Sequence, residues 1–411
     1  MNIVLKKSSI YKQQSTIQIT GSKSETNRLL LLKALYPNIL LENASVSDDS
    51  DVMFAALHSN SDKIDIHHAG TAMRFLTSYF AIQQEREVFI TGSSRMKERP
   101  IKILVEALRQ LGADIIYTEQ LGFPPLKIFG KKITKNKVTV AANVSSQYIS
   151  ALLLIAPKLE NGLELYLEGS ITSIPYIKMT LGILNDLGID ASFQNNLITV
   201  KPYNIVSNPN FIIESDWSSA SYYYSIIALS PLNTEISLSN FKENSLQGDA
   251  VLKDIYKNFG VETTFVTNGI RLKKTGSSCH NIDFDLNSSP DIAQTIVVTC
   301  LGLGVESNLK GLHTLRIKET NRLEALKLEL TKLGASVIIT ESTLKLESTR
   351  KLKTNVSINT YQDHRMAMAF APLALKVPLK INDSEVVSKS YPTFWEDLKS
   401  IGFQISNETT L

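Results

Sequence analysis

A glycine that follows a helical pattern and precedes a β-rich run recurs at intervals of about 70 residues along this 411-residue chain. In ALRQLGADIIY, for example, a helical pattern ends at Gly112 and a β-rich run follows. Glycine readily adopts the left-handed conformation that closes many helices, so each instance predicts a helix, its end and then a strand. The glycines of this series are Gly112, Gly188, Gly260, Gly334 and Gly402. Such a period predicts a chain built from repeated α/β units.

A second series of helical patterns, each opening with small polar residues, runs in phase with the glycines. Examples are SKSETNRLLLL, SSQYISALLLIA and SSASYYYSIIAL. Each unit therefore supplies two helices and several short strands such as NKVTVAA and LELYLEG. Six units of about 70 residues account for the whole chain, and two groups of three would form two domains. Residues 54–66 are a candidate degenerate first copy that lacks the glycine.

The composition excludes several classes of protein. A formal net charge of +3 is too small for the dominant basic surface of a general nucleic-acid binder. No apolar run approaches the ~20 residues of a membrane span, and the start MNIVLKKSSI lacks the apolar core of a signal peptide. The two cysteines, Cys279 and Cys300, give no disulfide framework. We therefore expect a cytoplasmic protein with neither nucleic acid nor membrane as a partner.

Lysine and arginine residues stand near the predicted helix starts, where the partial positive charge of the helix N-terminus disfavours them. Lys318 and Arg322, four residues apart in RIKETNR, would also share one helix face and repel each other. The set comprises Lys23, Arg28, Arg74, Lys97, Arg99, Arg316, Lys318, Arg322, Arg365 and Lys389. For each cation taken alone, the alternative interpretation is a surface residue whose aliphatic stem covers apolar surface. Repeated in both halves of the chain, the placement predicts that anions occupy these helix starts.

We interpret the whole set as a site for a polyanionic small molecule held between two lobes. Arginine suits bidentate contacts with carboxylate or phosphate, and lysine acts as a compact charge. Polar residues at two further helix starts, in VSSQY and TSIPY, would suit a phosphate cradle. They are Ser145, Ser146, Gln147, Ser173 and Tyr176. Ordinary helix N-capping is the alternative, and the two roles are compatible.

Two acids among these cations are candidates for proton transfer. Neighbouring cations or burial could tune the pKa of Asp291, in NSSPDIAQ, or of Glu319, in IKETNR. The alternative for Asp291 is a simple first-turn residue after Pro290. The acidic run 47–51 lacks partners at metal-ligand spacing and favours a helix entry. No phosphate-loop or complete dinucleotide motif is present, and neither cysteine lies in a basic helix start that would favour a thiolate nucleophile.

Ten fragments in order closely resemble the 5-enolpyruvylshikimate-3-phosphate synthase family, from Gly21 to Lys389. They are GSKSETNR, AGTAMR, RMKERP, VSSQ, SIPY, SDWSSASYY, LQGD, PDIA, RIKETNR and DHRMAM. The resemblance implies a two-lobed inverse α/β barrel of six βαβαββ repeats, three per lobe, with a degenerate first repeat. One lobe would comprise residues 20–215, and the other residues 1–19 and 216–411.

The resemblance also implies the reaction. The enolpyruvyl group of phosphoenolpyruvate is transferred to the 5-hydroxyl of shikimate 3-phosphate, phosphate leaves, and no metal or organic cofactor takes part. The expected molecule is a monomer. The implied shikimate 3-phosphate contacts are Ser24, Arg28, Ser145, Ser146, Gln147, Ser173, Tyr176, Asp291 and Lys318. The implied phosphoenolpyruvate contacts are Lys23, Gly70, Arg99, Gln147, Arg322, Arg365 and Lys389.

By the same resemblance, Asp291 accepts the proton of the attacking hydroxyl, Glu319 is the acid at the methylene carbon, and Lys23 assists phosphate departure. The chain departs from the family pattern at Phe75, where the family usually has proline, and at Thr314, which aligns with a contact asparagine.

Two alternatives remain open. The sister enzyme, UDP-N-acetylglucosamine enolpyruvyl transferase, uses a catalytic cysteine in a loop of the first lobe, and the corresponding segment RMKERPIKIL contains none. A non-catalytic anion-binding protein could keep the site without the chemistry. Loss of Asp291, Glu319 or Lys23 would favour it, and all three are present.

Overall fold

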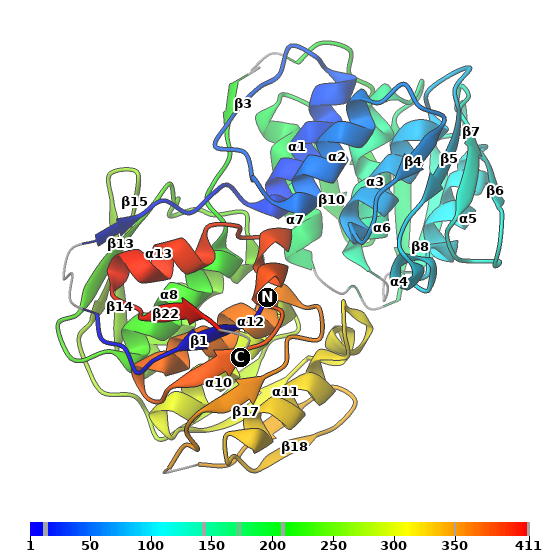
Figure 1. Cartoon of the computed structure of the whole chain (residues 1–411). Helices are drawn as coiled ribbons and strands as arrows, with labels where there is room; N and C mark the ends of the chain where they lie inside the picture. Colours follow the sequence, from blue (N-terminus) through cyan, green and yellow to red (C-terminus); the bar gives the residue numbers. More distant parts are fainter. Residues whose placement is uncertain are drawn as a thin grey trace. The chain divides into compact units, whose positions relative to one another are not determined.

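The computed structural model divides the chain into two compact units. The inserted unit comprises Gly21–Ile213, and the terminal unit comprises Met1–Thr20 and Glu214–Leu411 (Figure 1). The structure describes residues 1–10, 15–141, 145–169, 171, 174–206, 210–348 and 351–408. The sequence analysis placed the boundaries at residues 20 and 215, within two residues of this division.

The inserted unit contains seven α-helices and ten strands among its described residues. The helices are α1 (Lys23–Leu35), α2 (Asp48–His58), α3 (Gly70–Ala81), α4 (Ser94–Lys97), α5 (Lys102–Leu111), α6 (Ser146–Ile155) and α7 (Ile174–Asp186), with the 3-10 turn η1 (Ala156–Lys158). The strands are β3 (Leu40–Glu42), β4 (Lys63–Asp65), β5 (Glu87–Thr91), β6 (Asp114–Tyr117), β7 (Leu126–Phe129), β8 (Lys137–Ala141), β9 (Leu163–Glu168), β10 (Ala191–Gln194), β11 (Leu197–Val200) and β12 (Asn210–Ile212).

The described part of the terminal unit contains six α-helices and twelve strands. The helices are α8 (Trp217–Leu229), α9 (Leu252–Ile255), α10 (Ala293–Leu303), α11 (Arg322–Lys332), α12 (His364–Phe370) and α13 (Phe394–Ile401). The 3-10 turns are η2 (Gly248–Val251), η3 (Tyr256–Phe259), η4 (Pro290–Ile292), η5 (His313–Ile317), η6 (Ala371–Leu375) and η7 (Ser384–Lys389). The strands are β1 (Ile3–Leu5), β2 (Ser15–Ile17), β13 (Glu235–Ser239), β14 (Val261–Val266), β15 (Gly269–Lys274), β16 (Asn281–Asp285), β17 (Glu306–Lys310), β18 (Val337–Ile339), β19 (Leu344–Leu346), β20 (Val356–Ile358), β21 (Leu379–Ile381) and β22 (Ile405–Asn407).

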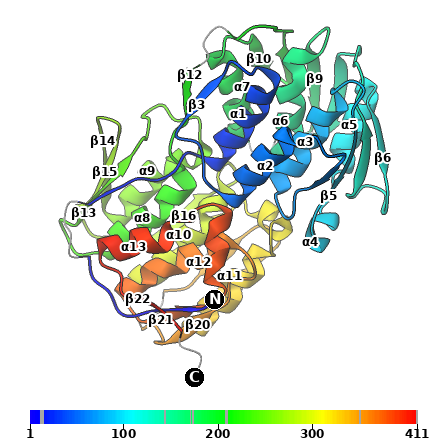
Figure 2. The ribbon, with the colours of Figure 1, turned by 45° about the horizontal axis from the view of Figure 1, so that its top comes forward.

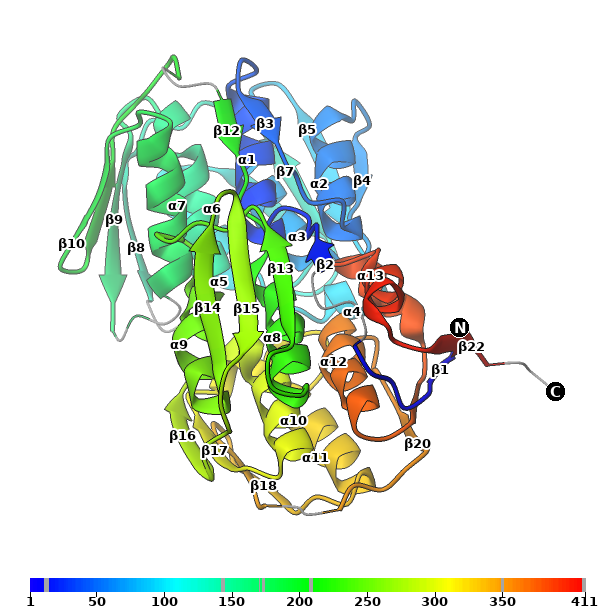
Figure 3. The same ribbon diagram turned by 90° about the vertical axis from the view of Figure 1, so that its left-hand side faces the viewer.

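Five four-stranded sheets share one topology. In each, a parallel pair of strands is extended on one side by two antiparallel strands. The strand orders are β4-β5-β7-β6, β8-β9-β11-β10, β2-β13-β15-β14, β16-β17-β19-β18 and β20-β21-β1-β22. Figure 3 shows β13, β15 and β14 of one such sheet side by side. In the last sheet the N-terminal strand β1 lies between β21 and β22, which ties the two ends of the chain together.

The sixth sheet contains two described strands, β3 and β12, which pair in parallel. It belongs to the inserted unit and lies next to the points where the chain passes from one unit to the other. Strand β2, before the first passage, pairs with β13, and β12, before the second, pairs with β3. In each unit, a strand on one side of the first passage therefore pairs with a strand on the same unit's side of the second passage.

The glycine series adopts the backbone conformation that the sequence predicted. All five glycines have positive φ angles, 109° at Gly112, 83° at Gly188, 70° at Gly260, 100° at Gly334 and 122° at Gly402. Each lies at or just after a helix end, and at most two residues separate it from the next strand. The helix–glycine–strand prediction is confirmed.

The core of the terminal unit is made by helices that are apolar on nearly every side. Helix α10 packs against both α8 and α12, as Figure 2 also shows. Their buried surface explains why SSASYYYSIIAL and AQTIVVTC contain no charged residue. The acidic side chains lie instead at the helix starts, at Asp216, Asp291 and Asp363. Among the described helices, none is long and apolar enough to cross a bilayer.

Candidate active site

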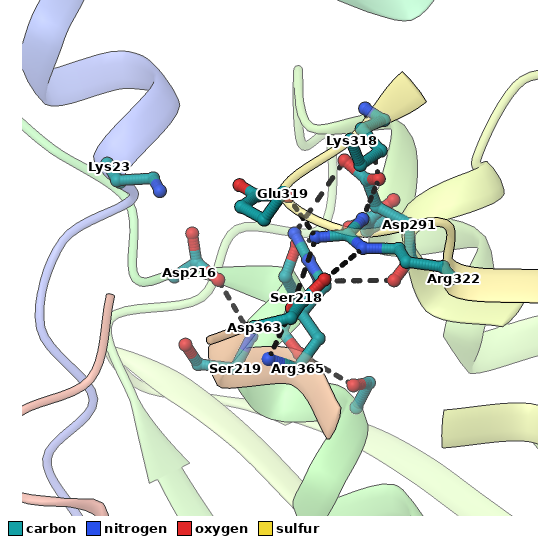
Figure 4. Close-up of polar contacts among 12 residues, drawn as sticks. Lys23, Asp216, Ser218, Ser219, Asp291, Lys318, Glu319, Arg322, Asp363 and Arg365 are labelled. Carbon is teal, nitrogen blue, oxygen red and sulfur yellow. Dashed lines mark hydrogen bonds and ion pairs between the residues drawn. The ribbon is translucent and has the colours of Figure 1, made fainter. Parts of the chain in front are cut away.

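A buried arginine organises the helix starts of the terminal unit. The side chain of Arg322, the first residue of α11, is 2% exposed and contacts three carboxylates (Figure 4). Its Nε donates to Asp363 Oδ2 at 2.6 Å, and its Nη1 and Nη2 donate to Asp291 Oδ1 and Glu319 Oε2, both at 2.8 Å. Burial alone would lower the pKa of Arg322, but the three carboxylates outweigh it and raise the pKa above its ordinary value.

Asp291 lies among three cations. Besides Arg322, its carboxylate contacts Lys318 Nζ at 3.2 Å and Arg365 Nη2 at 3.7 Å. Burial would raise the pKa of Asp291, but Lys318, Arg365 and Arg322 together hold it well below its usual range. The carboxylate is therefore ionised throughout the neutral range and can act as a proton acceptor.

The start of α12 supplies the next cation. Asp363 caps this helix by accepting from the backbone N–H of Arg365 at 2.9 Å. The Arg365 guanidinium donates to the backbone carbonyl of Asp291 at 3.1 Å and to Ser218 Oγ at 3.2 Å. Lys389 Nζ donates to the carbonyl of Gln362 at 2.8 Å, one residue before the cap. Five of the predicted residues thus contact one another directly, and Lys389 contacts the loop that leads into them.

The predicted repulsion between Lys318 and Arg322 on one helix face is wrong. Helix α11 begins only at Arg322, capped by Asn321, and Lys318 lies before it in extended backbone. Asp291 accepts from both cations, so the pair is bridged by a carboxylate. Two other members of the cation set pair outside this cluster, Lys97 with Glu119 and Arg316 with Glu341.

Three residues of the site escaped the sequence analysis as single positions, although the fragments that contain them were recognised. They are Asp363 in DHRMAM, Ser218 in SDWSSASYY and Asp249 in LQGD. Asp363 carried a usable signal, because aspartate before a helical run is a favoured N-cap. Asp249 is 5% exposed and accepts a hydrogen bond from Ser218 Oγ.

Burial raises the pKa of Asp249 to about 6, and Asp291 and Asp216 add to this while Arg365 and Ser218 oppose it. The folded state therefore retains a proton that the unfolded state has released, and stability falls as the pH rises from about 4 to about 6. Above that range the ionised carboxylate costs roughly 3 kcal/mol, from about two pKa units at 1.36 kcal/mol each. We expect Asp249→Asn to be more stable than the parent at pH 8, by up to about that amount, and to lose the advantage near pH 4.

Urea unfolding of both proteins at the two pH values measures this difference. The exposed Asp254→Asn is the control, with an expected change within about 0.5 kcal/mol at both. An advantage of Asp249→Asn that is equal at pH 4 and pH 8 would contradict the assignment.

In the inserted unit, Arg28 is held by neutral acceptors. It is 3% exposed, and its guanidinium donates to Thr180 Oγ1 at 2.8 Å, Ser150 Oγ at 3.0 Å and the Ser24 carbonyl at 2.7 Å. The carbonyl of Tyr176 accepts at 3.4 Å. Burial lowers the pKa of Arg28 to about 10, so it remains charged at neutral pH.

A second group lies at the start of α3, where no side chain caps the helix. The Arg99 guanidinium packs against Gly70 so closely that a Cβ there would lie 2.3 Å from Nη1. Arg74 donates to the Gly70 carbonyl at 3.0 Å, and burial, with repulsion from Arg99, lowers the pKa of Arg74 to about 10. Gln147 Nε2 donates to Thr71 Oγ1 at 3.2 Å, which joins α6 to this helix start.

Arg28, Arg74 and Arg99 share one property: within the described residues, no carboxylate lies within 4 Å of their guanidinium groups. Among the described residues, these three cations therefore lack the close carboxylate partners that Arg322 has, and Glu25 acts on Arg28 only from a greater distance. Phe75 contributes to this arrangement, because its buried ring lies 5.4 Å from Arg28 Cζ. Such a cluster favours the binding of anions.

The remaining predicted residues lie at the starts of α1 and α6. Lys23 Nζ pairs with Asp49 Oδ2 at 3.0 Å. Ser145 caps α6 by accepting from the Gln147 N–H at 3.4 Å, and the adjacent Ser146 is buried. Ser173 lies outside the described residues. The ligand roles of all these residues remain predictions.

Neither cysteine is activated. Burial raises the pKa of Cys279, and that of the fully buried Cys300 to above its ordinary range. Within the described ranges, no three His, Cys, Asp or Glu side chains gather into a metal-binding group. The clustered carboxylates can transfer protons, and the fixed cations beside them can stabilise anions.

Comparison with known proteins finds relatives that align with most of this chain. The chain is 47% identical to the 3-phosphoshikimate 1-carboxyvinyltransferase of Bacteroides fragilis over 399 residues, which covers 95% of this chain and 96% of that one. It is 36% identical to the enzyme of that name from Haemophilus influenzae over 422 aligned residues, covering 94% of this chain and 96% of that one.

Two solved structures share the fold. The EPSP synthase of Acinetobacter baumannii superposes with a TM-score of 0.80 at 19% identity and covers 99% of this chain and 100% of that one. The enolpyruvyl transferase NikO of Streptomyces tendae superposes with a TM-score of 0.74 at 12% identity and covers 100% of this chain and 99% of that one. They confirm the predicted α/β fold. Residues 42–398 match the family described as EPSP synthase (3-phosphoshikimate 1-carboxyvinyltransferase), and the chain belongs to that family.

Proposed function

We propose that this chain transfers the enolpyruvyl group of phosphoenolpyruvate to the 5-hydroxyl of shikimate 3-phosphate, giving 5-enolpyruvylshikimate 3-phosphate and phosphate. The observation that carries the proposal is the contact of the Asp291 carboxylate with Lys318, Arg322 and Arg365, in a chain that matches the family over residues 42–398. The product would feed chorismate and aromatic amino acid synthesis.

The first chemical step forms a carbon–oxygen bond. The 5-hydroxyl attacks C2 of phosphoenolpyruvate, its proton passes to Asp291, and the methylene C3 receives a proton from Glu319. The product of this step is a tetrahedral ketal. Strong ion pairs make Asp291 a weak base, so its proton transfer accompanies carbon–oxygen bond formation, when the hydroxyl becomes acidic. Fixed cations stabilise the charge that shifts during the step.

The second step reverses the proton movement at C3. Phosphate leaves C2, the C3 proton returns to a carboxylate, and the carbon–carbon double bond forms again in the product. Lys23 would neutralise the departing phosphate. The ammonium group of Lys23 contacts Asp49 at 3.0 Å, so phosphate would compete with that carboxylate.

Substrate anions would bind to the cations that have no close carboxylate partner in the described chain. The carboxylate of shikimate 3-phosphate would contact Arg28, and its phosphate the hydroxyls of Ser145, Ser146 and Ser173. Phosphoenolpyruvate would contact Arg99 beside Gly70, together with Arg365 and Lys389. Arg28 and Arg99 have no carboxylate partner within 4 Å in the described part of the chain, which favours this assignment.

A steady-state phosphate-release assay tests the function. We expect phosphate release when phosphoenolpyruvate and shikimate 3-phosphate are both present, and background release when either is left out. UDP-N-acetylglucosamine in place of shikimate 3-phosphate is the second control, since the sister activity would use it. Substrate binding without phosphate release would instead support an anion-binding protein and overturn the proposal.

Gly70→Ala tests the phosphoenolpyruvate assignment. The added Cβ would meet the Arg99 guanidinium at 2.3 Å and displace it, because the end of a flexible side chain moves more readily than backbone. We expect the KM for phosphoenolpyruvate to rise about tenfold, from the loss of one charged contact, and the KM for shikimate 3-phosphate to stay within about twofold. An unchanged KM for phosphoenolpyruvate would remove Arg99 from that site.

A further inference from the structure

The segment 247–249 connects the starts of two buried helices in the terminal unit. Gln247 Oε1 accepts from the backbone N–H of Trp217 at 3.0 Å, and Asp249 accepts from Ser218 Oγ, both at the start of α8. The carbonyl of Gly248 accepts from Ser289 Oγ at 2.9 Å, just before η4 and Asp291. The segment therefore lies beneath the active-site cluster without belonging to the predicted site.

The hydroxyl of Ser218 has two partners with fixed roles. The guanidinium of Arg365 can only donate, so at 3.2 Å the Ser218 oxygen must accept from it. The single hydroxyl proton of Ser218 is then directed to Asp249. A carboxylate at position 249 thus fixes the orientation in which Ser218 presents its lone pairs to Arg365.

We propose that Asp249 is a positioning residue for phosphoenolpyruvate binding, which acts through Ser218 to hold the guanidinium of Arg365 in place. The inference rests on the proposed function, in which Arg365 binds phosphoenolpyruvate. It assigns to Asp249 a role in the reaction although this side chain contacts no reacting atom.

The indirect arrangement serves anion binding better than a direct one. Asp249 forms no ion pair within 4 Å in the described structure, so it reaches Arg365 through the neutral hydroxyl of Ser218. A direct pair would add a second carboxylate to the 3.7 Å contact that Arg365 already makes with Asp291. That second contact would neutralise the cation that phosphoenolpyruvate needs.

A purely structural role for Asp249 makes different predictions from a positioning role. Loss of a structural contact would lower the melting temperature and affect both substrates alike, or neither. Loss of the positioning contact would weaken phosphoenolpyruvate binding selectively, because Arg365 belongs to that set. The ratio of the two KM values therefore separates the roles.

Four variants are compared with the parent protein by steady-state kinetics and thermal unfolding. For Asp249→Ala and for Ser218→Ala we expect the KM for phosphoenolpyruvate to rise about tenfold and the KM for shikimate 3-phosphate to stay within about twofold. The double variant should be no worse than either single one, because both remove the same connection. Asp249→Asn should keep the KM for phosphoenolpyruvate within about threefold of the parent, since the amide oxygen can accept from Ser218.

Ser225→Ala is the matched control. Its hydroxyl lies two turns further along α8, is fully buried and hydrogen-bonded to Thr299 Oγ1 at 2.8 Å, and does not contact the site cluster. We expect it to lower the melting temperature while leaving both KM values unchanged.

Three outcomes overturn the inference. They are an unchanged KM for phosphoenolpyruvate in Asp249→Ala, an equal rise in both KM values, and additive effects of the two alanine substitutions. The activity of the parent protein distinguishes failure of this inference from failure of the proposed function. If the parent releases no phosphate from the two substrates, the proposed function is wrong. If the parent is active and Asp249→Ala has an unchanged KM for phosphoenolpyruvate, only the inference is overturned.

Discussion

Replacement of Arg322 by methionine is expected to lower the free energy of unfolding by about 3–5 kcal/mol, the usual cost of removing one partner from a buried ion pair. The guanidinium is 2% exposed, and its partner Asp363 is fully buried, so the substitution leaves an uncompensated carboxylate in the interior. Urea unfolding followed by circular dichroism measures the change. Catalysis should be lost at the same time, because Asp291 and Glu319 both lose a charged neighbour.

Two further variants identify the cause. Arg322→Met combined with Asp363→Asn should recover part of the lost stability, because position 363 then carries no unpaired buried carboxylate. Arg316→Met is the matched control: its side chain is 26% exposed and its carboxylate partner Glu341 is 87% exposed, so a change of less than about 1 kcal/mol is expected. An Arg322→Met protein as stable as the parent would show that the three carboxylates do not depend on this cation.

Asp291→Asn is expected to lower kcat by about a thousandfold, the middle of the range for loss of a general base. Asparagine has nearly the same shape and can still accept from Arg322, but it cannot accept the proton of the attacking hydroxyl. Dissociation constants for shikimate 3-phosphate, measured by titration calorimetry, should stay within several-fold. The kinetic loss would then lie in the chemical step rather than in binding.

Asp285→Asn, at the exposed end of β16, is the control and should keep the parent kcat. The pH profile gives an independent check. Because three cations hold the pKa of Asp291 far below neutrality, its protonation should cause no loss of kcat on mild acidification. Turnover close to that of the parent in Asp291→Asn would reject Asp291 as the base.

Local features of the fold could be predicted from the sequence because they depend on short-range chemistry. The glycine that ends a helix needs a positive φ, and all five glycines of the series have one. The acidic run 47–51 was expected to enter a helix, and α2 begins at Asp48. Both depend on the preferences of the residues themselves, whatever the rest of the chain does.

The error at Lys318 and Arg322 shows where local reasoning failed. Their spacing of four suggested one helix face, but α11 begins only at Arg322, where the side chain of Asn321 caps it. The carboxylate of Asp291, 31 positions before Arg322 in the sequence, contacts both cations. No local pattern can identify such a partner, because the contact depends on how separate helices pack.

The sequence by itself determined the repeated α/β units, the buried character of the helices and the polar residues at their starts, since propensity, capping and hydrophobic patterning act over a few residues. Tertiary structure alone decided which charges meet. It placed three carboxylates on Arg322, left Arg28 and Arg99 with none within 4 Å in the described chain, and joined Asp249 to Arg365 through Ser218, 147 positions away from that arginine. The physical reason is that burial makes each of these charges costly without a suitable partner, and only the packing of distant helix starts determines which partner is within reach.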